Sequence, residues 1–194
     1  MTKPSYEVPT WNKIHRMLHN QAERICESSF KPQIILGISR GGLIPARVLS
    51  DLLENSNLAI VWLESLQVVD GDKRPQMLVQ ALSIDVAGKK VLIVDDVADT
   101  GRSLITVKQH VLQNGAEETR IATLYFKPWS ELKPEYYEKE TGRWIIFPWD
   151  MKENVRRIIK DKATLSAKEI SGLPNKLIRK LLNFGMEKTN CENK

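Results

Sequence analysis

The sequence has few cysteines and no long apolar run, and each absence excludes a class of protein. Only 2 of its 194 residues are cysteine. Cys26 and Cys191 have neither the density of a disulfide framework nor the spacing of metal ligands, so we expect free thiols. No stretch approaches the ~18 uninterrupted apolar residues of a membrane span. Because residues 1–7 also lack the apolar core of a signal peptide, we expect a cytoplasmic protein without membrane contacts.

The body of the chain has almost no net charge, and the excess of basic residues lies near its end. The chain has 29 Lys and Arg residues and 24 Asp and Glu residues. From Lys152 onward there are 11 basic and 5 acidic residues, whereas residues 1–151 contain 18 basic and 19 acidic ones. A nearly neutral body does not need a polyanion as a partner. We therefore do not expect nucleic acid to be the main ligand, and the basic character belongs to the tail.

Short apolar runs alternate with helical patterns along the first 150 residues. The expected elements are a helix at about 10–28, a strand at 34–38, a helix at 43–53, strands at 58–63 and 91–94, a helix at 104–113, a strand at 121–126 and a last apolar run at 144–147. Strands that alternate with helices predict an α/β fold with a doubly wound, mainly parallel sheet. In such sheets the ligand site lies at the carboxyl ends of the strands.

The segment from Val91 to Ser103 combines a buried strand with two acids and a phosphate-type turn. Four apolar residues precede Asp95 and Asp96, and a Thr-Gly-Arg-Ser turn at residues 100–103 opens the next helix. Free N–H groups at a helix start bind phosphate, and carboxylates accept hydrogen bonds from ribose hydroxyls or hold Mg²⁺. Adjacent buried acids repel each other, so a purely structural role does not explain them. The segment predicts a site for a phosphorylated sugar.

A second loop, Gly37-Ile38-Ser39-Arg40-Gly41-Gly42, follows the strand expected at 34–38. Its glycines let backbone amides approach an anion closely, and the Arg40 guanidinium adds a forked cation. A Gly-Gly turn between a strand and a helix is also common in loops without a ligand. This loop therefore supports a phosphate site only together with the segment that ends at Ser103.

These segments resemble a known family. Residues 91–103 resemble the phosphoribosyl pyrophosphate motif of the type I phosphoribosyltransferases, whereas the P-loop and dinucleotide-binding patterns are missing. Lys127-Pro128-Trp129, followed by Trp144-Ile145-Ile146-Phe147-Pro148-Trp149-Asp150, resembles the xanthine-guanine and archaeal 6-oxopurine branch. The resemblance covers about residues 10–152. It implies a purine-salvage enzyme that uses phosphoribosyl pyrophosphate, a 6-oxopurine (guanine, hypoxanthine or xanthine) and Mg²⁺, and that forms a homodimer.

The resemblance also implies roles for individual residues. Asp95 and Asp96 would hold the ribose hydroxyls, with Asp96 also holding the metal, and Asp99 would contact purine N7. Lys127 would donate to the 6-oxo group, and Trp144 would stack on the ring. A lysine ammonium favours an oxygen acceptor over an amino donor, which disfavours adenine. The other residues implied to bind substrate are Ser39, Arg40, Gly41, Ala98, Thr100, Gly101, Arg102, Ser103, Ile145 and Asp150.

Two segments have no assigned role. Residues 65–76 are either a hood over the site or a plain surface loop, and they lack the Ser-Tyr pair common in the family. We divide the chain into a phosphoribosyltransferase domain at 1–152 and a basic helical extension at 153–194, with a helical pattern at 173–182. Two alternatives to a purine enzyme stay open. One is a phosphoribosyl pyrophosphate-sensing regulator that binds nucleic acid through the extension, and the other is an orotate-type transferase.

Overall fold

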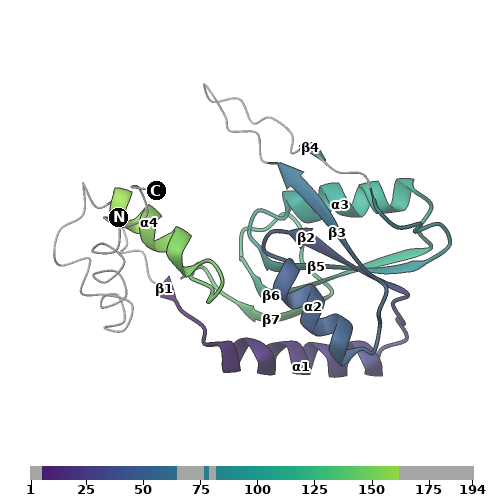
Figure 1. Cartoon of the computed structure of the whole chain (residues 1–194), viewed down its shortest axis with the longest axis horizontal. Coiled ribbons are helices and arrows are strands. Elements are labelled where there is room, and N and C mark those ends of the chain that lie inside the picture. The colour runs from purple at the N-terminus through teal and green to yellow at the C-terminus, as the bar shows by residue number, and fades with distance from the viewer. Residues whose placement is uncertain (1–5, 65–76, 79–81, 162–194) are drawn as a thin grey trace, which may run out of the picture. The chain divides into compact units, whose positions relative to one another are not determined.

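The computed structural model describes residues 6–64, 77, 78 and 82–161 (Figure 1). The hood or loop at 65–76 and the helical pattern at 173–182 lie outside the described residues. The chain divides into two compact units, one of residues 12–142 and the other of residues 1–11 and 143–194. The boundary expected at residue 152 stays a prediction. No helix in the described part of the chain is long and apolar enough to cross a membrane.

A six-stranded sheet with the order β4-β3-β2-β5-β6-β7 forms the centre of the larger unit. Five strands run parallel, and β4 (Met77–Leu78) pairs antiparallel with β3. The parallel strands are β3 (Leu58–Glu64), β2 (Ile34–Ser39), β5 (Lys90–Ala98), β6 (Glu118–Phe126) and β7 (Tyr136–Glu140). This arrangement confirms the predicted α/β class with a doubly wound, mainly parallel sheet.

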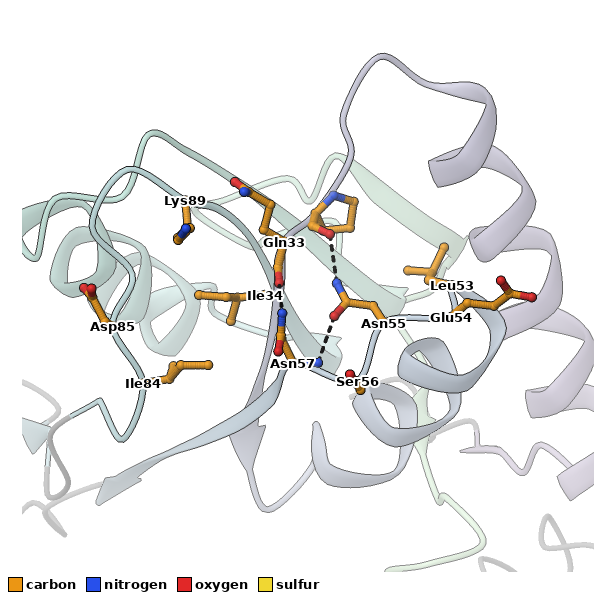
Figure 2. A pocket seen from close by; sticks show the side chains of 11 residues that line it. Gln33, Ile34, Leu53, Glu54, Asn55, Ser56, Asn57, Ile84, Asp85 and Lys89 are labelled. Atoms are coloured by element: carbon orange, nitrogen blue, oxygen red, sulfur yellow. Dashed lines mark hydrogen bonds between the residues drawn. The ribbon is translucent and has the colours of Figure 1, made fainter.

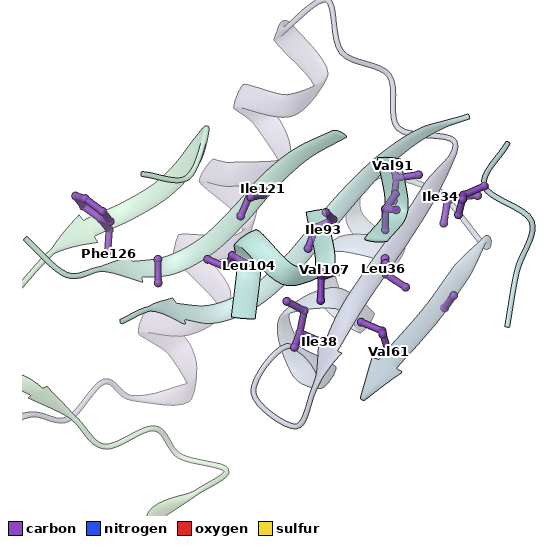
Figure 3. Close-up of a cluster of buried hydrophobic side chains, with 14 residues drawn as sticks. Ile34, Leu36, Ile38, Val61, Val91, Ile93, Leu104, Val107, Ile121 and Phe126 are labelled. Atoms are coloured by element: carbon purple, nitrogen blue, oxygen red, sulfur yellow. The ribbon is translucent and has the colours of Figure 1, made fainter. Parts of the chain in front are cut away.

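Helices cover both faces of this sheet (Figure 1). Helix α3 (Arg102–Gln113) lies on one face, and α1 (Trp11–Glu27) and α2 (Leu43–Leu52) lie on the other. Because side chains alternate along a strand, every second residue of β2 joins a core beneath α3 (Figure 3). That core contains Ile34, Leu36, Ile38, Val61, Val91, Ile93, Leu104, Val107, Ile121 and Phe126.

Helices α1 and α2 pack closely against the opposite face of the sheet. A Cβ atom placed on Gly37 would lie 2.9 Å from the Cβ atom of Ala46, so glycine allows α2 to approach β2. The Gln21 side chain of α1 donates a 2.6 Å hydrogen bond to the Thr123 carbonyl oxygen of β6. With both faces covered, β2 and β5 are almost wholly apolar until their carboxyl ends.

The expected elements between residues 10 and 126 are present, but several extend further than their apolar patterns. Strand β5 does not end at Val94; it continues through both acids to Ala98, because β5 stays paired with β6 up to the register Ala98–Phe126. Helix α3 begins at Arg102 and β6 at Glu118, both earlier than expected. Strand β7 lacks an apolar pattern and was not expected.

The described residues of the smaller unit form a two-stranded parallel sheet and a helix. Strand β1 (Tyr6–Glu7) pairs with β8 (Trp144–Ile145), and helix α4 spans Met151–Asp161. The apolar run at 144–147 is therefore a strand only in its first half. The Ile146 N–H donates to the Glu7 carbonyl oxygen at 2.9 Å, and the rings of Phe147 and Trp149 stack at 4.8 Å.

The chain order fixes where a ligand can enter the larger unit. From β2 the chain passes through α2 to β3 on one side, whereas from β5 it passes through α3 to β6 on the other side. The direction of winding therefore reverses between β2 and β5. Doubly wound sheets bind ligands at such a reversal, beside the loops that follow the two strands at the carboxyl edge.

Candidate active site

The predicted phosphate loop after β2 contacts strand β5 at this reversal point. A Cβ atom on Gly41 would lie 2.6 and 2.7 Å from the two carboxylate oxygens of Asp96. A Cβ atom on Gly42 would lie 2.2 Å from the Val94 carbonyl oxygen. The loop after β2 therefore rests directly on the end of β5, and only glycine fits at these positions. The Arg40 side chain is exposed, and the Ser39–Arg40 peptide bond is cis.

The paired acids near the end of β5 lie side by side in a partly buried position. Asp95 and Asp96 are both partly buried, and the Asp96 N–H donates a 2.9 Å hydrogen bond to Asp95 Oδ1. Burial raises the pKa of the Asp95 carboxyl well above its usual value, and the neighbouring Asp96 charge raises it further. A cation or a group of hydroxyl donors at this position would stabilise the ionised pair.

The turn that opens α3 has the features of a phosphate cradle. Gly101 lies at the helix start with a φ of 83°, a left-handed conformation that favours glycine. A Cβ atom there would also lie 2.7 Å from Ser130 Oγ and 2.8 Å from the Leu132 nitrogen. No side chain at Gly101 caps the helix, so the amino end of α3 presents backbone N–H groups and the positive end of its dipole.

A second set of contacts ties this turn to the segment after β6. The Glu131 N–H donates to the Thr100 carbonyl oxygen at 3.0 Å, and Arg102 Nε donates to Glu131 Oε1 at 3.2 Å. The Lys127 N–H donates to the Ala98 carbonyl oxygen at 2.9 Å. The predicted sugar and phosphate residues, including Ser103, therefore lie at one sheet edge with Lys127.

Asp99 and Lys127 contact the same tryptophan. The indole N–H of Trp129 donates a 2.9 Å hydrogen bond to Asp99 Oδ1, and Lys127 Nζ lies 5.4 Å from the centre of the Trp129 ring. Lys127 is only 6% exposed, whereas Asp99 is exposed. The sequence identified Trp129 as part of the Lys127-Pro128-Trp129 segment but did not predict that it contacts Asp99.

The three remaining predicted residues belong to the smaller unit, where two residues of α4 join them. Trp144 is 39% exposed, and its indole N–H donates a 2.8 Å hydrogen bond to Asn154 Oδ1. The Arg157 guanidinium lies 4.7 Å from the centre of the Trp144 ring. Ile145 is buried. The spacing of 150, 154 and 157 on one helical face is the sequence signal that could have identified Asn154 and Arg157.

Asp150 is the most perturbed acid of the smaller unit. Burial raises its pKa to about 6, while hydrogen bonds from Asn154 and from the Phe147 backbone oppose the shift. Its Oδ1 atom is buried and makes no hydrogen bond within the described residues. A buried acceptor without a donor is costly, so this oxygen is suited to accept a hydrogen bond from a ligand.

A separate pocket lies at the opposite edge of the larger unit (Figure 2). It has a volume of about 500 Å³ and lies near the amino ends of β2 and β3. Its amide side chains bond the backbone: Asn55 Nδ2 donates to the Pro32 carbonyl oxygen at 2.8 Å, and Asn57 Nδ2 donates to that of Gln33 at 3.1 Å. These contacts hold loops together, and none of the predicted site residues lines this pocket.

Comparison with known proteins supports the sequence-based resemblance. A family model described as a phosphoribosyl transferase domain matches residues 10–156. A xanthine-guanine phosphoribosyltransferase of Chromohalobacter salexigens is 31% identical over 144 residues, which cover 73% of this chain and 82% of that protein. A second one, from Nitratidesulfovibrio vulgaris, is 30% identical over 143 residues, which cover 73% of this chain and 82% of that protein.

Solved structures show the same fold. A purine phosphoribosyltransferase from Pyrococcus horikoshii is 38% identical with a TM-score of 0.68, and the match covers 75% of this chain and 93% of that one. A Neisseria gonorrhoeae protein of unassigned function, solved with bound ppGpp, is 26% identical with a TM-score of 0.68, covering 77% of this chain and 92% of that one. Both matches span most of the solved chains.

Proposed function

Because the chain belongs to the phosphoribosyltransferase family, we propose that it transfers ribose 5-phosphate from phosphoribosyl pyrophosphate to N9 of a 6-oxopurine and releases pyrophosphate. The observation that carries this proposal is the contact between the loop after β2 and the paired acids of β5. The backbone of Gly41 lies against the Asp96 carboxylate. A ligand held there would meet an anion-binding loop on one side and a sugar-binding acid on the other, as phosphoribosyl pyrophosphate requires.

The paired acids also fit the Mg²⁺ ion that the family implies. Mg²⁺ usually takes one or two protein carboxylates and completes its shell with water and substrate phosphates. The described residues contain no group of three or more metal-binding side chains, but Asp95 and Asp96 are adjacent and partly buried. Asp96 would hold the ion, with Asp95 beside it. When bound, Mg²⁺ would neutralise charge on the departing pyrophosphate.

The residues of the larger unit would act mainly by positioning and by charge. The bond from ribose C1 to pyrophosphate breaks as the bond from C1 to N9 forms. The Arg40 guanidinium stabilises the departing pyrophosphate, together with Ser39 and Gly41 of the same loop. Asp95 accepts hydrogen bonds from the ribose hydroxyls. The amides of the loop from Ala98 to Ser103 hold the 5′-phosphate, and Asp99 accepts the proton at N7.

Three side chains would select the base. The Lys127 ammonium donates to the 6-oxo group, which adenine lacks. Trp144 stacks on the purine ring, beside the buried Ile145. The unpartnered Oδ1 of Asp150 accepts a hydrogen bond from the edge that carries the 2-substituent. Above the pKa of about 6, Asp150 is mostly ionised, so at neutral pH it favours a donor such as the 2-amino group of guanine.

Pyrophosphate release tests the proposal directly. The full chain is mixed with phosphoribosyl pyrophosphate and Mg²⁺, and guanine, hypoxanthine, xanthine, adenine and orotate are supplied in separate reactions. We expect release with one or more 6-oxopurines and loss of release when EDTA removes Mg²⁺. Turnover only with orotate would identify a pyrimidine enzyme. No turnover with any base would refute the enzyme assignment and favour a ligand-binding regulator, to be tested by salt-dependent nucleic-acid binding.

A glycine substitution tests the contact between the loop after β2 and Asp96. Gly41→Ala places a methyl group within 2.6–2.7 Å of the Asp96 carboxylate, so either the loop or the acid must move. We expect KM for phosphoribosyl pyrophosphate to rise about tenfold or more, since roughly 1.4 kcal/mol of lost binding has that effect. Gly88→Ala is the control, because a Cβ atom there meets nothing within 4 Å. The control has a strained φ of 65° and should lose stability while KM stays unchanged. Equal KM values for both variants would contradict the assigned site.

A further inference from the structure

Core packing does not explain the position of Trp129. It is 56% exposed, so burial of its ring contributes little to the core. Its indole N–H is nevertheless used, because it donates the 2.9 Å hydrogen bond to Asp99 Oδ1. A Cβ atom placed on Gly142 would lie 3.5 Å from the ring, so the far side of the indole rests near the backbone after β7. The ring therefore lies between Gly142 and Asp99, and its N–H has one definite partner.

The same ring also contacts the lysine predicted to select the base. Lys127 Nζ lies 5.4 Å from the ring centre, within the range of a cation–π contact. The backbones of the two regions are linked as well, because the Lys127 N–H donates to the Ala98 carbonyl oxygen next to Asp99. Trp129 therefore contacts an acid and a cation from two different strand ends, β5 and β6.

The chemistry of a 6-oxopurine explains why such a bridge is useful. N7 and O6 are neighbouring atoms on one edge of the base. A carboxylate for N7 and an ammonium for O6 must therefore lie at a fixed separation. The two groups also attract each other and would form an ion pair that excludes the base unless something holds them. An indole that donates to the acid and presents its π face to the ammonium satisfies both groups without neutralising either.

We propose that Trp129 is a positioning residue that holds the Asp99 carboxylate and the Lys127 ammonium at the spacing of the N7–O6 edge. The inference rests on the proposed function. Because the indole hydrogen bond uses Asp99 Oδ1, the second oxygen of the carboxylate would serve purine N7. Loss of the indole N–H should then impair the step at N7 and leave the binding of phosphoribosyl pyrophosphate unaffected.

Trp129→Phe is the variant to measure, because it removes the N–H donor and keeps an aromatic, although smaller, ring. We expect kcat with guanine to fall about tenfold, since a hydrogen bond to a charged group contributes roughly 1.5–3 kcal/mol. KM for phosphoribosyl pyrophosphate should stay within about twofold, because phosphate binding does not involve this bond. Trp62→Phe is the matched control, as Trp62 is 47% exposed on β3. It should match the original chain in kcat.

A double variant separates positioning from a merely structural role. If Trp129 acts through Asp99, the substitution should cost almost nothing in an Asp99→Ala background, because coupled residues are not additive. A full tenfold loss in that background would overturn the inference, as would an unchanged kcat for Trp129→Phe alone. The original chain is the reference for the proposed function. If it turns over a 6-oxopurine and only the Trp129 results fail, the inference falls and the function stands; if it turns over none, both fall.

Discussion

Replacing Asp99 with Asn is expected to lower kcat with guanine about 100-fold or more, the scale of effect typical of a lost proton acceptor. Asn keeps the size of the side chain and an Oδ1 atom that can still accept the 2.9 Å hydrogen bond from Trp129. What it loses is the negative charge that, in the proposed reaction, accepts the N7 proton as the bond at N9 forms. Since the phosphate loop is unchanged, KM for phosphoribosyl pyrophosphate should change little.

Pyrophosphate release under single-turnover and steady-state conditions measures this effect. The control is Asp85→Asn, because Asp85 is an exposed acid whose Oδ1 accepts a 3.0 Å hydrogen bond from the Ala87 N–H, which Asn can also accept. This control should keep full activity. An Asp99→Asn variant with unchanged kcat would remove Asp99 from the chemical step and leave its contact with Trp129 as its only assigned role.

The parts of the fold that sequence predicted best are those buried on both faces. Strand β2 is apolar from Ile34 to Ile38 because helices cover both sides of it, so its pattern is visible without a structure. Strand β7 is different. It lies at the sheet edge with the sequence Tyr-Tyr-Glu-Lys-Glu, and its exposed positions tolerate charge. The local hydrophobic pattern therefore does not predict β7. This strand is defined by its pairing with β6.

The loops of the site were also visible in the sequence, because each requires particular residues close together in the chain. Gly101 needs a left-handed conformation, and Gly41 must admit a carboxylate at its Cα atom. Contacts between distant segments could not be predicted in the same way. The bond from Trp129 to Asp99 joins residues 30 apart and depends on the register of β5 and β6, which places Ala98 opposite Phe126.

The environment of Asp150 is a second feature that the sequence could not predict. Its position in the Pro-Trp-Asp segment was visible from sequence, but its raised pKa of about 6 and its unpartnered Oδ1 depend on the surrounding packing. Asn154 contributes to that environment through its hydrogen bonds to Trp144 and to the Asp150 backbone. The start of α4 therefore shapes the surroundings of Asp150 and Trp144, which the sequence pattern did not indicate.

Lys127→Met should remove most of the preference for 6-oxopurines over adenine. Lys127 as a whole is only 6% exposed, so an adenine amino group placed against its ammonium would bury two donors facing each other. A 6-oxo group instead gains a charge-assisted hydrogen bond. Methionine keeps most of the apolar stem and removes the charge. We expect kcat/KM for guanine to fall about 100-fold, since sites built to bond a polar group discriminate strongly through it.

The ratio of kcat/KM for guanine to that for adenine is the quantity to measure. Lys127→Met should lower this ratio mainly because kcat/KM for guanine falls. The value for adenine should stay the same or rise slightly, because an opposing donor has been removed. Lys89→Met is the matched control, because Lys89 is an exposed lysine at the opposite edge of the sheet. A ratio that stays the same in Lys127→Met would show that another donor forms the hydrogen bond to the 6-oxo group. An equal loss for both bases would show that Lys127 supports the site without selecting the base.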